Sequence, residues 1–231
     1  MIKLLGVEFH LYGLIIGLAI LSGWQISSEY AKRQGIKNEL VGKIAWWVII
    51  GGLIGARAYH VIDFWKRYYH FNYLKCLYLW QGGLGIWGGI VGGIIGLIGY
   101  NWLGNKTKIN FWKLLDLTVI GVPLGQAIGR LGNWINGELY GKNGEPLFLW
   151  EAGLNLILFG ILWQIGKKKL STTKNKSITG IYLIGYGLIR MSLENFRAEE
   201  IIWRWHEFPV AIIMGIMAVI SGSVIIFLRE K

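Results

Sequence analysis

Near the middle of the chain lies the run Leu124-Gly-Gln-Ala-Ile-Gly-Arg-Leu-Gly-Asn-Trp-Ile-Asn-Gly-Glu-Leu-Tyr-Gly141, in which polar side chains close an apolar segment. If the segment is helical to about residue 135, Arg130 and Asn133 share one helix face. Gly129 and Gly132 leave the backbone bare beside them, so a partner helix or a ligand can come close. Because an arginine at membrane depth is costly unless it meets an anion or lines a wet cavity, the run predicts a ligand site. A purely structural polar cluster is the alternative.

The composition of the chain is that of a membrane protein. Of its 231 residues 54% are hydrophobic, only three are proline, and the mean hydropathy is +0.45. Thirteen tryptophans and eleven tyrosines suit a protein with many membrane–water interfaces. The single cysteine, Cys76, excludes an intramolecular disulfide framework and a cysteine-rich zinc site. We expect no metal and no cofactor.

The net charge of +11 raises the question of a nucleic-acid partner. The basic residues bunch between apolar segments instead of forming a stripe, which favours anionic lipid over nucleic acid. The first apolar run lacks a small-x-small cleavage site, so we expect no cleavable signal peptide.

Apolar stretches long enough to cross a bilayer recur along the sequence. We expect an all-α polytopic membrane protein, with residues 1–231 forming a single transmembrane domain of about seven helices. The expected spans are residues 9–28, 42–62, 83–103, 114–135, 147–165, 178–197 and 208–228.

The distribution of lysine and arginine predicts the orientation in the membrane. The loops after the odd-numbered spans hold 14 of these residues, whereas the opposite side holds 6. The positive-inside rule then puts the N-terminus outside and the C-terminus in the cytoplasm. The four remaining arginines lie toward the outer half of the bilayer: Arg57, Arg130, Arg190 and Arg197.

Glycine dominates the third expected span, in which Gly85, Gly89 and Gly93 are four apart, as are Gly88, Gly92 and Gly96. Small residues at this spacing let helices pack closely in lipid, so we expect a helix–helix contact here. The aromatic residues 68–81 are expected to lie along the outer interface.

Further polar residues lie in the other spans. His10 and Tyr12 at the edge of the first span suit interfacial anchors. Arg57 is flanked by small residues and followed by His60, and Asp116 is expected to have a snorkelling or structural role. Glu151 lies close to the start of the fifth span, where we expect it to pair with an arginine.

The sixth span carries Tyr186, Arg190 and Glu194 on one helix face, with Arg197 beyond them. Arg190 and Glu194 can form an intrahelical ion pair that locks the bundle, or Arg190 can bind a ligand. The surplus of arginines over acids in the outer half favours a ligand. A guanidinium fork suits a phosphate, and lipid phosphate is the anion most available at this depth.

Together these motifs resemble the prolipoprotein diacylglyceryl transferase family. The run Gly129-Arg-Leu-Gly-Asn-Trp-Ile-Asn-Gly-Glu-Leu-Tyr-Gly141 is similar to the family signature nearly position for position. His10-Leu-Tyr-Gly13, Gly55-Ala-Arg-Ala-Tyr59, Trp80-Gln-Gly-Gly-Leu84, the segment from Pro146 to Glu151, and Tyr186-Gly-Leu-Ile-Arg190 with Glu194 and Arg197 support the resemblance.

The resemblance implies a bacterial plasma-membrane enzyme. It moves the diacylglyceryl group of phosphatidylglycerol to the lipobox cysteine of a preprolipoprotein signal peptide, releasing glycerol phosphate. The implied catalytic residues are Arg130, Arg190, Glu138, Tyr12 and Asn133. The implied phosphatidylglycerol-binding residues are Arg130, Asn133, Arg57, Tyr186, Arg190, Glu194 and Gly141, with His10, His60, Glu151 and Arg197 as secondary candidates.

The sequence departs from the family pattern at Trp87, where many members carry a histidine that is a candidate general base. His10, His60 or Glu138 is the alternative base, or the arginine field alone favours the thiolate. The segment between Gly141 and Pro146 is also short, and the seventh span lacks a polar family motif. Two competing functions are a transporter of anions or lipids and an inactive relative that binds lipid or signal peptides.

Overall fold

The structure, a computed structural model, describes residues 2–4, 7–9, 11–78, 82–105, 108–167 and 177–230, which are mostly helical. The chain forms two compact units. One comprises Asn38–Leu115, and the other comprises Met1–Lys37 together with Asp116–Lys231.

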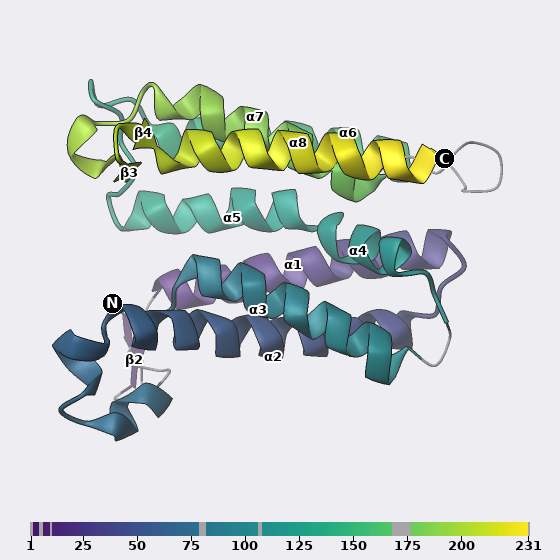
Figure 1. The fold of residues 1–231 in the computed structure, drawn as a ribbon, viewed down its shortest axis with the longest axis horizontal. Helices are drawn as coiled ribbons and strands as arrows, with labels where there is room; N and C mark the ends of the chain where they lie inside the picture. Colours follow the sequence, from purple (N-terminus) through teal and green to yellow (C-terminus); the bar gives the residue numbers. More distant parts are fainter. Residues whose placement is uncertain are drawn as a thin grey trace. The chain divides into compact units, whose positions relative to one another are not determined.

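The unit Asn38–Leu115 is built on two antiparallel helices, α2 (Asn38–Asp63) and α3 (Ile86–Gly99), seen in Figure 1. Gly88, Gly92 and Gly96 of α3 lie directly against the α2 backbone at Gly55, Gly51 and Trp47, respectively. The expected glycine contact is therefore confirmed, since a Cβ at these positions would collide with a carbonyl group of α2. Along the chain, α2 is followed by the π-helical turn η1 (Trp65–Tyr69) and the 3-10 turn η2 (Tyr73–Leu77), which precede α3. The π-helical turn η4 (Tyr100–Gly104) follows α3.

The other unit contains α1 (Leu11–Arg33), α5 (Val122–Ile135), α6 (Leu147–Gly166), α7 (Ile178–Glu194) and α8 (Val210–Glu230). Figure 1 shows α5, α7 and α8 with their axes roughly aligned. Helix α7 packs antiparallel on α8, with Gly180 against Gly222 and Gly187 against Gly215. Two short antiparallel hairpins accompany the helices, β1 (Ile2–Leu4) with β2 (Val7–Phe9) and β3 (Arg204–Trp205) with β4 (Phe208–Pro209).

The expected span over residues 114–135 is divided into two helices, α4 (Phe111–Val119) and α5. Pro123 has no N–H group to donate to the carbonyl of Val119, so a continuous helix would lose a hydrogen bond there. The chain turns at Ile120 and Gly121, and a Cβ on Gly121 would collide with the backbone of Gly23 in α1. A close helix contact thus coincides with the break.

A buried ion pair joins α4 to the last helix. The carboxylate of Asp116 accepts hydrogen bonds from Arg229 Nη1 at 2.7 Å and from the backbone N–H and hydroxyl of Thr179 at 2.9 and 2.8 Å. Arg229 also donates to the Ser177 hydroxyl, which caps α7 by accepting from Gly180 N. Asp116 therefore has the structural role that we expected, and it connects three helices.

Each expected span coincides with a helix or a pair of helices. Within the described residues, five segments are long and apolar enough to cross a membrane: Asn38–Asp63, Ile86–Gly104, Phe111–Ile135, Leu147–Gly166 and Val210–Arg229. The fold is thus that of a helical membrane protein, and the count of seven spans stays a prediction.

The glycine row gives a direct test of the α2–α3 contact. Gly92→Ala places a methyl group against the carbonyl oxygen of Gly51, whereas Gly93→Ala meets Val48 Cγ1 at an ordinary 3.6 Å. We expect Gly92→Ala to destabilise the protein by about 1–3 kcal/mol through overpacking. Gly93→Ala should be neutral or slightly stabilising because alanine favours helix. Thermal unfolding in detergent distinguishes the two, and equal melting temperatures would contradict the contact.

Candidate active site

A buried carboxylate lies at the centre of the site. Glu151, in the second turn of α6, is 1% exposed and accepts hydrogen bonds from Arg130 Nη2 of α5 and from Arg190 Nη1 of α7, the latter at 3.3 Å. The expected pairing of Glu151 with an arginine is therefore present, and it involves two. One side chain thus joins three helices.

A second carboxylate extends the cluster. Glu194, 2% exposed, lies 3.8 Å from Arg190 Nη2 and 3.4 Å from Arg197 Nη1. The result is an ion-pair chain, Arg130–Glu151–Arg190–Glu194–Arg197, in which positive and negative groups alternate. Its three arginines exceed its two acids by one positive charge. Each arginine side chain is 20–23% exposed, so none of the three is fully enclosed by the protein.

The end of α5 folds back over its own last turn. Arg130 Nη1 donates to Asn133 Oδ1 at 3.2 Å, and Asn133 Nδ2 donates to Glu138 Oε2 at 3.2 Å. Asn136 Nδ2 holds the other oxygen of Glu138 at 3.3 Å. Gly137 makes this return with a φ of +67°, a conformation that glycine adopts without strain. The polar residues of the central run therefore form one hydrogen-bonded relay that begins at Arg130.

Gly141 joins the loop after α5 to the loop after α7. It forms a β-bridge with Arg197, and the next residue, Lys142, donates its N–H to the carbonyl of Phe196 at 2.9 Å. A Cβ at Gly141 would meet the Glu145 carboxylate and the carbonyl oxygen of Phe196. Any larger residue at this position would displace the Glu145 side chain or the Phe196 backbone.

Glu145 fixes the short turn between Gly141 and Pro146. Its carboxylate accepts hydrogen bonds from the side chain and the backbone N–H of Asn143, both at 2.9 Å. The bond from the Asn143 side chain is the main cause that lowers the pKa of Glu145. The turn is therefore held with Glu145 ionised.

Two tyrosines line α7 beside the ion-pair chain. Tyr186 lies one helical turn before Arg190, and its ring stacks on that of Tyr182 with centroids 5.8 Å apart. The Tyr182 hydroxyl accepts a hydrogen bond from Gln126 Nε2 of α5 at 3.0 Å. Gln126 and Tyr182 thus join α5 and α7 by a further polar contact.

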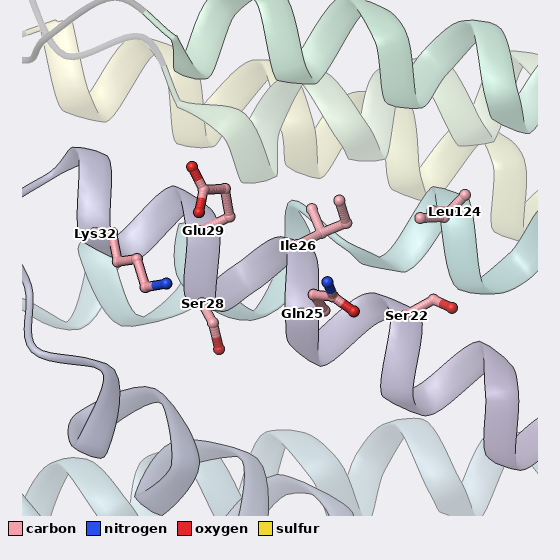
Figure 2. Close-up of a pocket in the computed structure, with 7 residues that line it drawn as sticks. All are labelled: Ser22, Gln25, Ile26, Ser28, Glu29, Lys32 and Leu124. Atoms are coloured by element: carbon pink, nitrogen blue, oxygen red, sulfur yellow. The ribbon is translucent and has the colours of Figure 1, made fainter.

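A separate polar pocket of about 360 Å³ lies on α1 and contains none of the predicted site residues. Figure 2 shows its lining, in which the polar side chains come from successive turns of α1. The lining residues are Ser22, Gln25, Ile26, Ser28, Glu29, Lys32 and Leu124.

Comparison with known proteins places the chain in a family. The family model described as prolipoprotein diacylglyceryl transferase matches residues 1–228. The chain belongs to this family. It is 29% identical to the phosphatidylglycerol–prolipoprotein diacylglyceryl transferase of Synechocystis sp., over 96% of this chain and 86% of the relative. Relatives with the same name from Synechococcus elongatus and Finegoldia magna are 32% and 31% identical, over 91% and 86% of this chain and 80% and 83% of theirs.

The family membership confirms the resemblance drawn from the sequence and does not favour the two competing functions. Most of the site residues implied by the resemblance lie together in the unit that contains α5, α6 and α7. They are Arg130, Asn133, Glu138, Gly141, Glu151, Tyr186, Arg190, Glu194 and Arg197. Tyr12 lies in the first turn of α1. His10 lies outside the described residues. Arg57 and His60 belong to the other unit.

Arg57 is 7% exposed, and its guanidinium donates hydrogen bonds to backbone carbonyl groups. Nε donates to the carbonyl of Cys76, Nη1 to those of Gly82 and Gly83, and Nη2 to those of Lys75 and Tyr78, at 2.5–3.1 Å. A planar fork with five donors suits this role and lysine does not. Arg57 therefore organises the segment between α2 and α3.

His60 and Trp87 belong to the same unit as Arg57. His60 Nδ1 is 3.0 Å from the Tyr69 hydroxyl, and the His60 ring stacks on Phe64. Trp87 occupies the first turn of α3. Of the three alternative bases, His60 and Glu138 are thus held by hydrogen bonds within their own units.

Sequence reasoning missed Gln126, Asn155 and Tyr182. Each is flanked by apolar residues or glycine within its helix, where a polar side chain is by default interpreted as a satisfied core residue. The missed signal is spacing: Gln126 lies four residues before Arg130, Asn155 four after Glu151, and Tyr182 four before Tyr186. Residues four apart share a helix face.

The five carbonyl contacts of Arg57 predict how a conservative substitution acts. Arg57→Lys keeps the charge but loses most of the charge-assisted hydrogen bonds, each worth roughly 1.5–3 kcal/mol. We expect chymotrypsin to cleave at the exposed Tyr68, Phe71 and Tyr73 at least about tenfold faster, because local opening becomes easier.

Arg67→Lys is the matched control, since that guanidinium only lies over the exposed Tyr68 ring, 5.8 Å from its centroid. Its cleavage rate in detergent should equal that of the wild type. Equal rates for Arg57→Lys and Arg67→Lys would show that Arg57 does not hold the segment.

Proposed function

We propose that this protein transfers the diacylglyceryl group of phosphatidylglycerol to the thiol of a lipobox cysteine in a preprolipoprotein signal peptide. The observation that carries the proposal is the Arg130–Glu151–Arg190 arrangement, in which the family signature supplies one arginine and α7 the other. Both arginine side chains are partly exposed, whereas Glu151 is buried. A phosphodiester there would meet two cationic forks.

The reaction forms a thioether. The cysteine sulfur attacks the glycerol carbon that bears the phosphate, a carbon–sulfur bond forms, and the carbon–oxygen bond to phosphate breaks. Glycerol phosphate leaves with the bonding electrons, and the thiol proton passes to a base or to the departing phosphate. Because the nucleophile belongs to the substrate, the enzyme has to align the two reactants and stabilise the charge that develops on the leaving group.

Arg130 and Arg190 stabilise that leaving phosphate. Asn133 orients Arg130 and is itself held by Glu138. Glu151 and Glu194 orient Arg190, and Arg197 and Gly141 fix the loops at the same end of the helices. Tyr12 and Tyr186 donate hydrogen bonds near the reacting carbon. Arg57 has a supporting role, because the backbone occupies its guanidinium.

Deprotonation of the thiol is favoured by the net positive charge of the ion-pair chain, which lowers the pKa of a nearby thiol. In this proposal the arginine field replaces the histidine that many relatives carry at the position of Trp87. No metal or cofactor takes part.

We place the protein in the bacterial plasma membrane with seven spans, the N-terminus outside, the C-terminus in the cytoplasm, and the ion-pair chain in the outer half. The support is the loop charge of 14 against 6 lysines and arginines, together with the position of Arg130 and Arg190 toward the C-terminal ends of α5 and α7. Both helices would run outward.

Single cysteines test this orientation. In a Cys76→Ser background, Lys142→Cys and Lys167→Cys each present one thiol at an exposed position. A membrane-impermeant maleimide added to intact cells should label Lys142→Cys and leave Lys167→Cys unlabelled until the membrane is opened. The reverse labelling pattern would invert the topology.

Substitution of Arg130 tests the chemistry. Loss of one preorganised contact to the developing charge typically lowers the rate about 10²–10³-fold, so we expect a loss of about 10²-fold or more for Arg130→Ala. The assay combines purified protein in phosphatidylglycerol vesicles with a lipobox-cysteine peptide, and mass spectrometry detects a peptide heavier by one diacylglyceryl group.

Arg204→Ala is the control, because Arg204 is more exposed and pairs with the exposed Glu199, which is not a member of the ion-pair chain. Its activity should stay within about twofold of the wild type, as for most surface substitutions. A folded Arg130→Ala variant with wild-type activity would refute the assignment, and a folded wild type without any adduct would refute the proposed function.

A further inference from the structure

A second polar layer lies one helical turn from the ion-pair chain. Arg130 at the end of α5 meets Glu151 near the start of α6, and Glu151 meets Arg190 near the end of α7, so α6 runs antiparallel to both neighbours. Moving four residues in the same direction along each helix leads to Gln126, Asn155 and Tyr186. Leu158 of α6 contacts the position of Gly185 on α7, which fixes this register.

The two amides of this layer have unused hydrogen-bonding groups. Asn155 is fully buried, and neither its Oδ1 nor its Nδ2 has a hydrogen-bond partner among the described residues. The same holds for Gln126 Oε1, while Gln126 Nε2 donates to Tyr182. Buried polar groups in proteins are almost always hydrogen-bonded. Two unsatisfied amides beside a phosphate site therefore point to a ligand group.

The chemistry of a diacyl phospholipid fits this layer. Its ester carbonyls are acceptors that lie a few bonds from the phosphate on the same glycerol, a separation comparable to one helical turn of about 5.4 Å. The Asn155 amide offers two donors at this depth. Because the Tyr182 hydroxyl can donate as well as accept, the Gln126 amide can turn over and present its N–H₂ group too.

We propose that Asn155, with Gln126 beside it, binds the ester carbonyls of the diacylglyceryl group while the phosphate lies on Arg130 and Arg190. The inference rests on the proposed function and specifies its substrate as an ester lipid. Gln126 is partly exposed and Asn155 is buried, so the proposal requires neighbouring side chains to move aside when the lipid binds. Holding the glycerol at both the phosphate and the esters fixes the reacting carbon between them.

The test compares phosphatidylglycerol with its diether analogue, which has the same headgroup and chains but no carbonyls. The wild type should show a kcat/KM for transfer from the ester lipid about tenfold above that from the diether, the scale of one or two hydrogen bonds. Asn155→Leu, of similar volume, should lower transfer from the ester lipid to the diether level and leave transfer from the diether unchanged.

Two further variants complete the design. Gln164→Leu changes an exposed amide on the same helix and should keep the wild-type preference. Gln126→Leu should reduce the preference, and it also provides a test if Asn155→Leu does not fold. Thermal unfolding in detergent checks the fold of each variant.

Three outcomes would overturn the inference and leave the proposed function intact. The wild type could use both lipids equally, Asn155→Leu could reduce both equally, as for a structural or water-binding amide, or folded Asn155→Leu could keep the full preference. A wild type that transfers from neither lipid would instead remove the proposed function, so the two failures are distinct.

Discussion

The carboxylate of Glu151 between two guanidiniums is the interaction on which the site depends. Burying a carboxylate costs several kcal/mol unless charge partners and hydrogen bonds replace water. Here Arg130 and Arg190 replace water as hydrogen-bond donors to Glu151, and each comes from a different helix. Removing either arginine would leave a buried charge less compensated, so the pair that would hold a phosphate also keeps α5, α6 and α7 in register.

The charge balance of the ion-pair chain matches the proposed reaction. A phosphodiester carries one negative charge, which neutralises the single surplus positive charge of the chain. The leaving phosphate monoester carries about −1.5 to −2 at neutral pH, as a phosphorylated side chain does. The ion-pair chain together with the bound product therefore becomes net negative. This charge favours release of glycerol phosphate and return of both guanidiniums to Glu151.

Much of the fold follows from the sequence because apolar length is a strong signal in a membrane protein. The positions of all seven expected spans coincide with helices, and the spacing of Arg130 with Asn133 and of Arg190 with Glu194 predicted real contacts. The break at Gly121 was not predicted, because Pro123 lies inside an otherwise apolar run and hydropathy does not register a missing N–H donor.

Contacts between distant residues were harder to predict. The carbonyls that hold Arg57 lie 18–26 residues away in an irregular segment, and no periodicity marks them. The unsatisfied amide of Asn155 becomes visible only once the helices around it are in place.

The Asp116–Arg229 pair has a consequence for biosynthesis, because its two members are separated by 113 residues of chain. At a translation rate of about 5–20 residues per second, roughly 6–23 seconds pass between the synthesis of the two. During that interval Asp116 can acquire its bonds from Thr179 but not its cation, and α4 holds an incompletely compensated carboxylate. Insertion of α8 therefore supplies the missing cation and completes the packing of helices that were synthesised earlier.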